Sequence, residues 1–257
     1  MRAFLKKYSP KFILYLYWRI KTTKVKIITF VPRYDEDELL TSHNCDFINE
    51  ERFKTAFSAA VERKLYVKPS MKWRAHVACW AAENATRIEG DFVECGVHKG
   101  FLSYIVMSYI DFNSHDKKCY LFDTFSSFDK QYLNENEREQ RSHYADVPCH
   151  YDISVNSVIK TFQKFPATQV IKGSVPNTLK DVNIDKVSYL SIDMNCAYPE
   201  IEALKFFWDK LSSGAIVILD DYGHAGHEEQ KIAFDKLSNE MNFSILSLPT
   251  GQGIIIK

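Results

Sequence analysis

From residue 91 onward, the sequence alternates short apolar runs with longer stretches of helical character, and this alternation limits the fold more than any other feature. Strand-like composition is found in seven runs: Asp91 to Val97, Cys119 to Phe122, Gln169 to Ile171, Val187 to Ile192, Ala215 to Leu219, Phe243 to Leu248 and Gly253 to Ile256. Helical stretches fall between these runs, at residues 101–112, 154–164, 200–211 and 228–242. Strands that alternate with helices in this way form a mainly parallel sheet with helices on both faces. The sequence therefore predicts an α/β fold with a doubly wound, mainly parallel seven-stranded sheet.

Several residues mark where the predicted helices begin and end. Pro199 suits the first turn of a helix, and Gly214 suits a break just after a helix end. Upstream, Glu50 to Glu89 has helical character, with a break at residues 68–70. Ser70 is the expected N-cap of the second of these helices, because serine side chains satisfy the free N–H groups at a helix start.

The first 49 residues are predicted to form an extension to a domain that spans residues 50–257. Basic side chains recur from Arg2 to Lys26, interleaved with aromatic ones, and no acidic residue occurs before Asp35. We favour a helical segment that packs on the domain or on a second subunit, with its lysines in solvent. A peripheral helix at a membrane surface is the alternative. The apolar run from Phe12 to Trp18 is too short to cross a bilayer, so no membrane span is expected.

Charge and cysteine content narrow the class of protein. The 33 basic residues balance 33 acidic ones, which removes the electrostatic reason to expect a nucleic-acid partner and favours a small or neutral substrate. The cysteines form no CxxC pair and no zinc-like spacing; they lie at positions 45, 79, 95, 119, 149 and 196. Several occur in apolar runs, where cysteine behaves as a small hydrophobic residue. We therefore expect reduced thiols in a cytoplasmic protein.

The clearest local signal is the segment from Asp91 to Gly100, DFVECGVHKG, in which a strand leads into a glycine turn and then a helix. Gly96 and Gly100 would let the backbone approach a ligand and let the helix pack closely on the sheet. The spacing differs from the dinucleotide pattern GxGxxG, and Glu94 would place a carboxylate near the path of a pyrophosphate. A cationic ligand fits better, and the methionine half of S-adenosylmethionine carries an ammonium and a sulfonium group. An ordinary glycine turn is the alternative.

A second signal supports a nucleoside-containing cofactor. Asp123 ends the second strand about 20 residues beyond the glycines, where an acidic residue can accept both hydroxyl groups of a ribose. Thr124 follows it and is included in the predicted cofactor site. After the third strand, Gly173 and Ser174 offer a small residue and a hydroxyl to the edge of an adenine, although a Gly-Ser pair is also common in turns. Together these residues predict S-adenosylmethionine as the cofactor.

Three aspartates follow the next two strands. Asp193 ends one strand, and Asp220 and Asp221 end the other. If these strands are neighbours, their ends lie about 5 Å apart at the carboxyl edge of the sheet. A magnesium ion or a similar hard cation would relieve the repulsion among three carboxylates. The alternative is that Asp220 and Asp221 cap a turn and point to opposite sides. His224 and His227 follow, and His224 is a candidate proton acceptor.

A charged stretch with no clear strand extends from Asp129 to Asp152. It is longer than most connections in a compact domain, and such segments are usually functional lids or are mobile. We expect it to act as a lid that excludes water and contributes to the choice of acceptor.

From Gly90 to Lys257 the chain resembles the macrocin O-methyltransferase-like family, whose members methylate sugar hydroxyls in macrolide, aminocoumarin and surface-polysaccharide pathways. The resemblance rests on ordered motifs: Asp91-Phe-Val-Glu-Cys-Gly-Val, Phe122-Asp-Thr-Phe, Gly173-Ser-Val-Pro-Asn-Thr-Leu, Leu190-Ser-Ile-Asp-Met-Asn, Leu219-Asp-Asp-Tyr-Gly and Leu248-Pro-Thr-Gly-Gln-Gly. It implies a Rossmann-like methyltransferase fold and a homodimer or higher oligomer formed through N-terminal helices. The acceptor would be a sugar, for example a nucleotide-activated heptose or deoxysugar for bacterial capsule, lipopolysaccharide or natural-product synthesis.

The resemblance also implies roles for individual residues. Asp193, Asp220 and Asp221 would hold a magnesium ion that also binds vicinal hydroxyls of the sugar. The cofactor site would include Glu94, Gly96, Asp123 and Ser174.

One position departs from the family pattern. Several characterised relatives carry an aspartate two residues after the first metal ligand and use it as general base, whereas this chain has Asn195. An amide cannot accept the proton, so either the cation acidifies the hydroxyl alone or another group, such as His224, takes the proton. A phenolic acceptor and a non-catalytic cofactor-binding protein remain open as alternatives. A nicotinamide oxidoreductase is disfavoured by the glycine spacing.

Overall fold

The computed structural model describes residues 31–65, 70–126, 128–139 and 153–257. The chain divides into two units, of which the larger contains residues 36–39 and 45–257. Most of the predicted N-terminal extension lies outside the described residues. A two-stranded sheet pairs β1 (Tyr34–Glu36) with β2 (Leu39–Thr41), and the turn between them, Asp37–Glu38, belongs to the larger unit.

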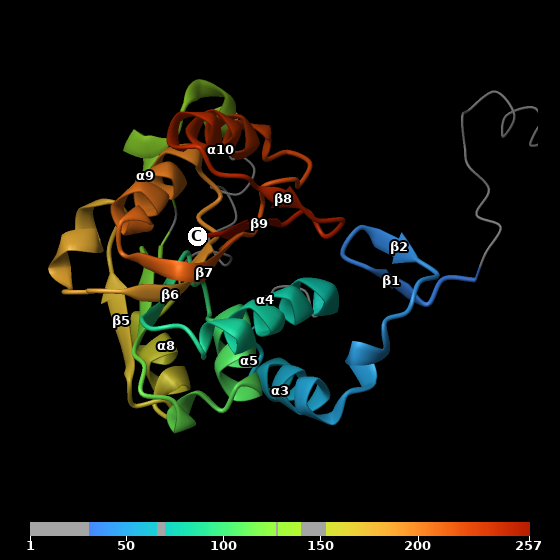
Figure 1. Cartoon of the computed structure of the whole chain (residues 1–257). Coiled ribbons are helices and arrows are strands. Elements are labelled where there is room, and N and C mark those ends of the chain that lie inside the picture. Colours follow the sequence, from blue (N-terminus) through green and yellow to red (C-terminus); the bar gives the residue numbers. More distant parts are fainter. Residues whose placement is uncertain (1–30, 66–69, 127, 140–152) are drawn as a thin grey trace, which may run out of the picture. The chain divides into compact units, whose positions relative to one another are not determined.

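The larger unit is built on a seven-stranded sheet of order β5-β4-β3-β6-β7-β9-β8 (Figure 1). Its strands are β3 (Asp91–Cys95), β4 (Cys119–Asp123), β5 (Thr168–Lys172), β6 (Val187–Ile192), β7 (Leu211–Leu219), β8 (Leu246–Ser247) and β9 (Gly253–Ile256). The first five strands in this order are parallel, and β9 runs antiparallel to both β7 and β8. The predicted doubly wound, mainly parallel sheet is therefore confirmed.

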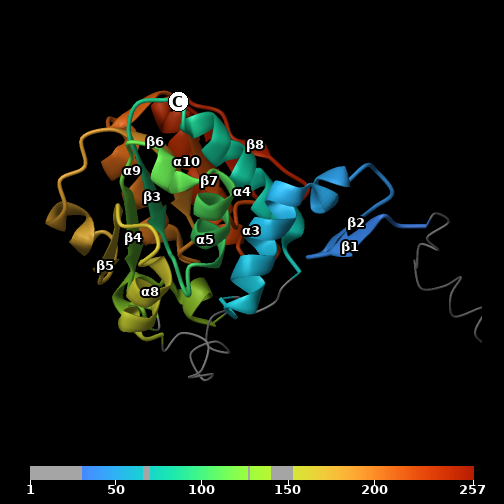
Figure 2. The ribbon, with the colours of Figure 1, turned by 90° about the horizontal axis from the view of Figure 1, so that it is seen from below.

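Helices cover both faces of this sheet, as the two ribbon views show (Figures 1 and 2). One face carries α3 (Glu51–Glu62), α4 (Lys72–Ala85), α5 (Phe101–Tyr109) and α8 (Val155–Phe162), and the other carries α9 (Ala197–Trp208) and α10 (Glu228–Met241). Covered on both sides, β6 is buried along its whole length, as expected for a central parallel strand. Short 3₁₀ turns occupy Asp46–Asn49, Phe112–Ser114, Lys130–Tyr132 and Asn177–Asp181.

The strand order changes direction between β3 and β6. The chain runs outward from β3 through β4 to β5 and then returns to β6 on the opposite side of β3. In doubly wound folds, ligands bind at the carboxyl ends of the strands beside such a change of direction. The fold therefore positions a binding site over the ends of β3, β4 and β6.

Some of the predicted local signals are confirmed and others are wrong. Pro199 does lie in the first turn of α9. The N-cap of α4 is Met71 rather than Ser70, and no side chain caps that helix. Gly214 lies within β7 instead of after a helix; its φ of +84° accompanies a register shift where β7 pairs with β6. A glycine at a strand irregularity serves the same need for positive φ as a glycine after a helix, so the sequence signal is ambiguous.

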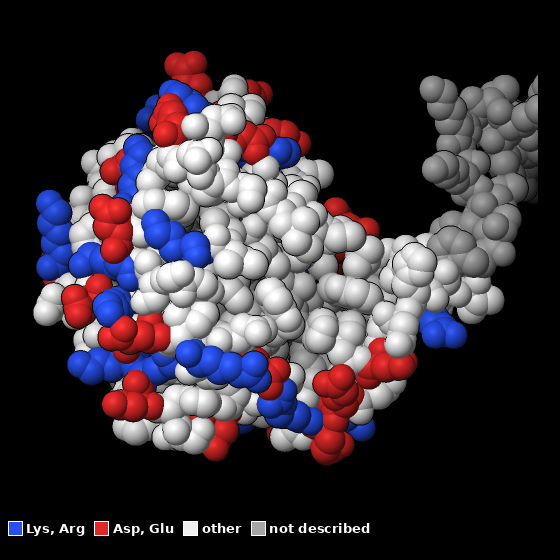
Figure 3. All heavy atoms as spheres, viewed as in Figure 1, with Lys and Arg blue, Asp and Glu red and all other residues white. Residues whose placement is uncertain are grey.

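Cysteines 45, 79, 95, 119 and 196 are free and buried, as expected for small core residues; Cys149 lies outside the described residues. Within the described part of the chain, no helix is both long and apolar enough to span a bilayer. On the face seen in Figure 3, acidic and basic side chains are interspersed around an uncharged central area. This distribution agrees with the balanced charge of the sequence.

Candidate active site

A cavity of about 800 Å³ lies over the carboxyl ends of the central strands. This volume is within the range of sites that hold small ligands and cofactors. Its lining includes most of the residues singled out from the sequence: Glu94, Gly96, Asp123, Thr124, Gly173, Ser174, Asp193, Asn195 and His224. Gly100, Asp220 and Asp221 do not belong to the lining, but one carboxylate oxygen of each of the two aspartates lies within 4.8 Å of one of Asp193, which does.

Glycine is required at positions 96 and 100, in the turn after β3, for two different structural reasons. Gly96 has a φ of +94°, and a Cβ there would lie 1.8 Å from the carbonyl oxygen of Asp193, so only glycine lets the ends of β3 and β6 approach. At Gly100, where φ is +81°, a Cβ would lie 2.4 Å from the ring of Phe162 on α8. Gly100 therefore serves helix packing, and the structure gives it no place beside a ligand in the cavity.

Asp123 holds in place the turn after β3, whose residues line part of the cavity. Its Oδ2 accepts hydrogen bonds from the backbone N–H groups of Val97 and His98, each at 2.7 Å, and its Oδ1 accepts one from Phe125 at 2.6 Å. With a longer contact from the Thr124 hydroxyl to Oδ1 at 3.4 Å, these bonds use all of the roughly four acceptor positions of a carboxylate. Asp123 thus fixes the glycine turn in addition to facing the cavity.

Ser174 links the end of β5 to the start of the predicted lid. Its hydroxyl donates to Oδ2 of Asp129 at 2.8 Å, and both residues line the cavity. Burial would raise the pKa of Asp129, but its hydrogen bonds with Gln131 and Ser174 together hold that pKa below its ordinary value. The part of the cavity wall formed by Ser174 and Asp129 is therefore polar.

Glu94 lies at the end of β3 with only 4% of its surface exposed. Its carboxyl group accepts a hydrogen bond from the hydroxyl of Ser103. Burial raises the pKa of Glu94 to about 8, and the nearby charges of Asp220 and Asp123 add to this effect. A carboxyl group of this kind is mainly protonated at neutral pH and ionises readily when a cationic group binds beside it.

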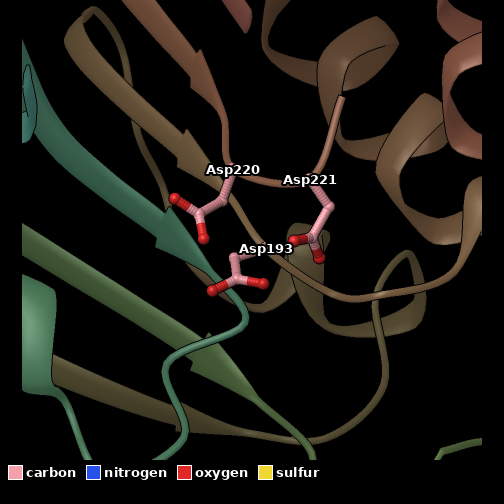
Figure 4. Close-up of side chains that lie close together, drawn as sticks. All are labelled: Asp193, Asp220 and Asp221. Atoms are coloured by element: carbon pink, nitrogen blue, oxygen red, sulfur yellow. The ribbon is translucent and has the colours of Figure 1, made fainter. Parts of the chain in front are cut away.

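The three predicted aspartates converge on one small volume (Figure 4). One carboxylate oxygen from each of Asp193, Asp220 and Asp221 lies within 4.8 Å of the others. The parallel register that pairs Ile192 of β6 with Leu219 of β7 places Asp193 beside Asp220. Asp220 and Asp221 therefore do not point to opposite sides, because β7 ends at Leu219 and the alternation of a strand no longer applies to them.

Each of these carboxylates has a different partner. Oδ1 of Asp193 accepts a hydrogen bond from the side-chain amide of Asn195 at 3.1 Å. Oδ1 of Asp220 accepts one from Gln252 at 2.9 Å. Oδ2 of Asp221 lies 3.2 Å from Nδ1 of His227, is buried, and receives no hydrogen bond.

The pKa values of the cluster reflect burial and mutual repulsion. Burial raises the pKa of Asp193 well above its ordinary value, and the charges of Asp220 and Asp221 raise it further. Burial also raises the pKa of Asp220, although Arg74 opposes the rise. Burial would raise the pKa of Asp221 too, but the contact with His227 and the charges of Arg74 and His224 together lower it. Convergent buried carboxylates, one with an oxygen lacking a hydrogen bond, are a donor set that suits a hard divalent cation.

Several residues of this site could not be found from the sequence. Arg74 on α4 reaches Asp220 and also Asp37 in the turn between β1 and β2. Glu200 on α9 accepts a hydrogen bond from the backbone N–H of Met194 at 3.0 Å and so holds the loop that follows Asp193. Burial raises the pKa of Glu200 to about 8. None of these residues lies in a recognisable motif, so no sequence signal identifies them.

The described part of the predicted lid, residues 129–139, packs against the starts of α9 and α10. Glu137 has 1% of its surface exposed and accepts hydrogen bonds from the backbone N–H groups of Ala197 at 2.7 Å and Asn134 at 3.0 Å. The side-chain amides of Asn134 and Asn136 donate to Glu229 on α10. The base of this segment is therefore fixed beside the aspartate cluster, while residues 140–152 lie outside the described part.

Comparisons with known proteins agree with this geometry. The model of the macrocin-O-methyltransferase (TylF) family matches residues 71–244, which is more than half of the chain. No curated protein sequence matches the chain. Among solved structures, that of the O-methyltransferase NovP is similar with a TM-score of 0.67 and 16% identity, over 82% of this chain and 98% of that one.

Two further solved structures share the fold at lower similarity. The calicheamicin methyltransferase CalS11 has a TM-score of 0.55 and 13% identity, over 83% of this chain and 94% of that one. An O-methyltransferase from Bacillus cereus, solved in complex with SAH, has a TM-score of 0.53 and 10% identity, over 82% of this chain and 96% of that one. The extent of the family match, on a sheet and cavity of this form, establishes that the chain belongs to the macrocin-O-methyltransferase (TylF) family and is an S-adenosylmethionine-dependent O-methyltransferase.

Proposed function

We propose that this enzyme transfers the methyl group of S-adenosylmethionine to a hydroxyl of a sugar, with the help of a magnesium ion or another divalent cation. The observation that carries the proposal is the convergence of Asp193, Asp220 and Asp221 beside the cofactor half of the cavity. The family match supports the sugar acceptor. CalS11, whose apo structure has 13% identity and a TM-score of 0.50, is a TDP-rhamnose 3′-O-methyltransferase and supports it as well.

On the cofactor side, Glu94 would neutralise the cationic methionine half of S-adenosylmethionine. Asp123 would accept from a ribose hydroxyl in place of its long contact with Thr124, whose hydroxyl has a shorter hydrogen bond to the carbonyl oxygen of Ser126 at 2.9 Å. Gly96 admits the ligand because it carries no side chain, and Thr124, Gly173 and Ser174 would face the adenosine part.

On the acceptor side, the three aspartates would hold the cation, and the buried oxygen of Asp221 without a hydrogen bond supports this assignment. When bound, the cation acts as a Lewis acid that acidifies a coordinated hydroxyl and stabilises the alkoxide as it forms. Asn195 orients Asp193 through its amide hydrogen bond. A new bond forms between the acceptor oxygen and the methyl carbon as the carbon–sulfur bond breaks, which yields S-adenosylhomocysteine.

The hydroxyl proton needs an acceptor other than Asn195. We assign this role to His224, which lines the cavity and packs against Gly251, where a Cβ would lie 3.0 Å from the imidazole ring. Imidazole is the side chain best suited to accept a proton near neutral pH. Holding the reactants in line contributes further, since alignment is worth about 7–11 kcal/mol of the barrier in favourable cases.

The lining also favours an uncharged sugar ring at the reacting end of the acceptor. Asp37 and Glu38 add two carboxylates to the lining of the cavity. The one Arg or Lys side chain among the described lining residues is Arg74, which is already paired with two carboxylates. Carboxylates accept hydrogen bonds from hydroxyls and repel phosphates. A phosphate-containing carrier would accordingly extend away from this region.

The proposal is tested by incubating the enzyme with S-adenosylmethionine, magnesium and a panel of nucleotide sugars, glycan fragments and catechols. Mass spectrometry should find a gain of one methyl group on a sugar, abolished by chelation and by Asp193→Ala but not by the matched surface variant Asp209→Ala. Full activity after thorough chelation would remove the metal role, and methylation of catechols alone would move the acceptor class to phenols. Cofactor binding with no turnover on any acceptor would identify a non-catalytic protein.

Two further aspects of this function remain proposals. We infer a cytoplasmic enzyme, because the cofactor and activated sugars are made there and five of its cysteines are free and buried. We also propose that residues 1–49 mediate assembly into a homodimer or higher oligomer, which light scattering of the full-length protein would measure.

A further inference from the structure

Arg74 lies between two carboxylates that are far apart in the sequence. Its guanidinium contacts Oδ2 of Asp220 through Nη1 at 2.5 Å, and Asp37 through Nε at 2.7 Å and Nη2 at 3.3 Å. The side chain is 12% exposed. Each of the three guanidinium nitrogens therefore contacts a carboxylate. A lysine, with one nitrogen, could not reproduce this planar arrangement.

The partner Asp37 belongs to a turn that lines the cavity. Both Asp37 and Glu38 have positive φ, at 53° and 60°. The neighbouring Glu36 forms an ion pair with Lys72, which lies two residues before Arg74 on α4. Two ion pairs thus fasten this turn to the first turn of α4, and only that of Arg74 continues to the aspartate cluster.

The other partner, Asp220, has both carboxylate oxygens held. Gln252 donates to Oδ1 and Arg74 contacts Oδ2, so the plane of the carboxylate is fixed before any cation binds. Hydrogen bonds of this kind to a metal-ligating group set its orientation, and losing one typically weakens metal binding about 10- to 100-fold. Because Asp220 is 2% exposed, removing the guanidinium would also leave a buried carboxylate without its counter-charge.

We propose that Arg74 is a positioning residue that orients Asp220 for the divalent cation and couples the cation site to the Asp37–Glu38 turn of the acceptor wall. The proposal rests on the cation role in the proposed function. It assigns to Asp37 an indirect effect on cation binding that acts only through Arg74, although Asp37 is not itself one of the three converging carboxylates.

The test measures Mn²⁺ binding to the cofactor-free protein by electron paramagnetic resonance, without any turnover. Arg74→Met should weaken Mn²⁺ binding about 10- to 100-fold. Arg74→Lys, which keeps the charge but not the planar fork, should restore only part of this loss. The control Arg52→Met removes a guanidinium from an ion pair with Glu83 on the helical face and should leave Mn²⁺ affinity unchanged.

A double-mutant cycle tests the coupling. Asp37→Asn should weaken Mn²⁺ binding in the wild-type background and have no further effect in Arg74→Met, because residues that act through one another are not additive. Additive effects would overturn the coupling. If Arg74→Met does not bind S-adenosylhomocysteine and is therefore misfolded, Asp37→Asn and Arg74→Lys decide the result alone.

The outcomes separate this inference from the proposed function. Tight Mn²⁺ binding by wild type that is abolished by Asp220→Ala but is tighter, or no more than threefold weaker, in Arg74→Met would overturn the role of Arg74 and leave the cation site standing. No Mn²⁺ binding by wild type would overturn both. In turnover assays the magnesium concentration for half-maximal rate should rise in Arg74→Lys while the KM for S-adenosylmethionine stays unchanged, which a general loss of stability would not produce.

Discussion

Asn195 donates a hydrogen bond to Asp193, the residue two positions before it, at the position where the family resemblance leads one to expect a general base. Residue 195 has a φ of +56°, a left-handed conformation that asparagine tolerates better than most residues. Glu200 anchors the preceding backbone at Met194. In this chain residue 195 therefore supplies a hydrogen-bond donor where the resemblance leads one to expect a proton acceptor.

The hydrogen bond from Asn195 to Asp193 predicts the effect of Asn195→Asp. The variant would set a carboxylate about 3 Å from Oδ1 of Asp193 and would remove the hydrogen bond that holds it. We expect the metal-free protein to lose about 1–3 kcal/mol of unfolding free energy. Magnesium should restore more stability to the variant than to wild type. Thermal unfolding with and without magnesium measures both effects. Asn195→Gly, which tolerates positive φ and adds no charge, is the control; an equal response to magnesium in both variants would contradict the prediction.

Glu94 predicts a dependence of stability on pH. Its pKa is raised from 4.5 to about 8 in the folded protein, chiefly by burial. The folded state therefore keeps a proton that the unfolded chain has released, and the stability of the cofactor-free protein falls as pH rises from about 4.5 to about 8. Glu94→Gln removes this contribution, so the variant should unfold at a higher temperature than wild type near pH 9.

Binding of S-adenosylmethionine should reverse the order of these two unfolding temperatures, so that wild type becomes more stable than Glu94→Gln. Glu94→Gln loses the carboxylate that would face the cationic part of S-adenosylmethionine. Its affinity for this cofactor should therefore fall at least tenfold, as calorimetric titration would measure.

Glu200 limits how much of the pH dependence the variant can remove. Its pKa is also raised to about 8, and it remains in Glu94→Gln, so part of the pH dependence of stability should persist. Identical unfolding temperatures for wild type and Glu94→Gln near pH 9 would show that Glu94 is ionised at little cost.

Asp123 is predicted to matter through the turn that it holds. Asp123→Asn would replace an acceptor oxygen with an NH₂ group that faces the backbone N–H groups of Val97 and His98, or of Phe125. We expect a loss of about 1–3 kcal/mol in unfolding free energy and at least a tenfold loss in affinity for S-adenosylhomocysteine. Asp116→Asn, in the exposed loop before β4, is the control. Unchanged affinity in Asp123→Asn would argue against this role.

Glu137 predicts a separate effect on the acceptor side. Glu137→Ala would leave the backbone N–H groups of Ala197 and Asn134 without their acceptor, at a cost of about 1–2 kcal/mol. Because this contact fixes the base of the lid beside α9, the KM for the acceptor should rise while the affinity for S-adenosylhomocysteine changes little. The matched control is Glu135→Ala on the exposed side of the same turn. If Glu137→Ala weakened cofactor binding more than acceptor binding, the prediction that Glu137 acts on the acceptor side would be wrong.

The strand pattern could be predicted because it is a local property. The bounds of β6 and β9 coincide with the predicted runs, since both strands are mainly apolar and largely buried and polar residues flank them. Signals that depend on a single residue were less reliable. Ser70 does not cap α4 and Gly214 does not follow a helix, because serine and glycine satisfy more than one local need.

The sequence by itself determined the α/β class, the order of strand ends that carry Glu94, Asp123, Asp193 and Asp220, and membership of the family. These follow from periodicity and from motifs that occupy only a few consecutive residues. Tertiary structure alone decided that Arg74 meets Asp220, 146 residues away, that Phe162 occupies the space beside Gly100, and that Glu137 caps α9. Each of these contacts joins segments whose separation along the chain carries no periodic signal, so only the packing of helices on the sheet brings them together.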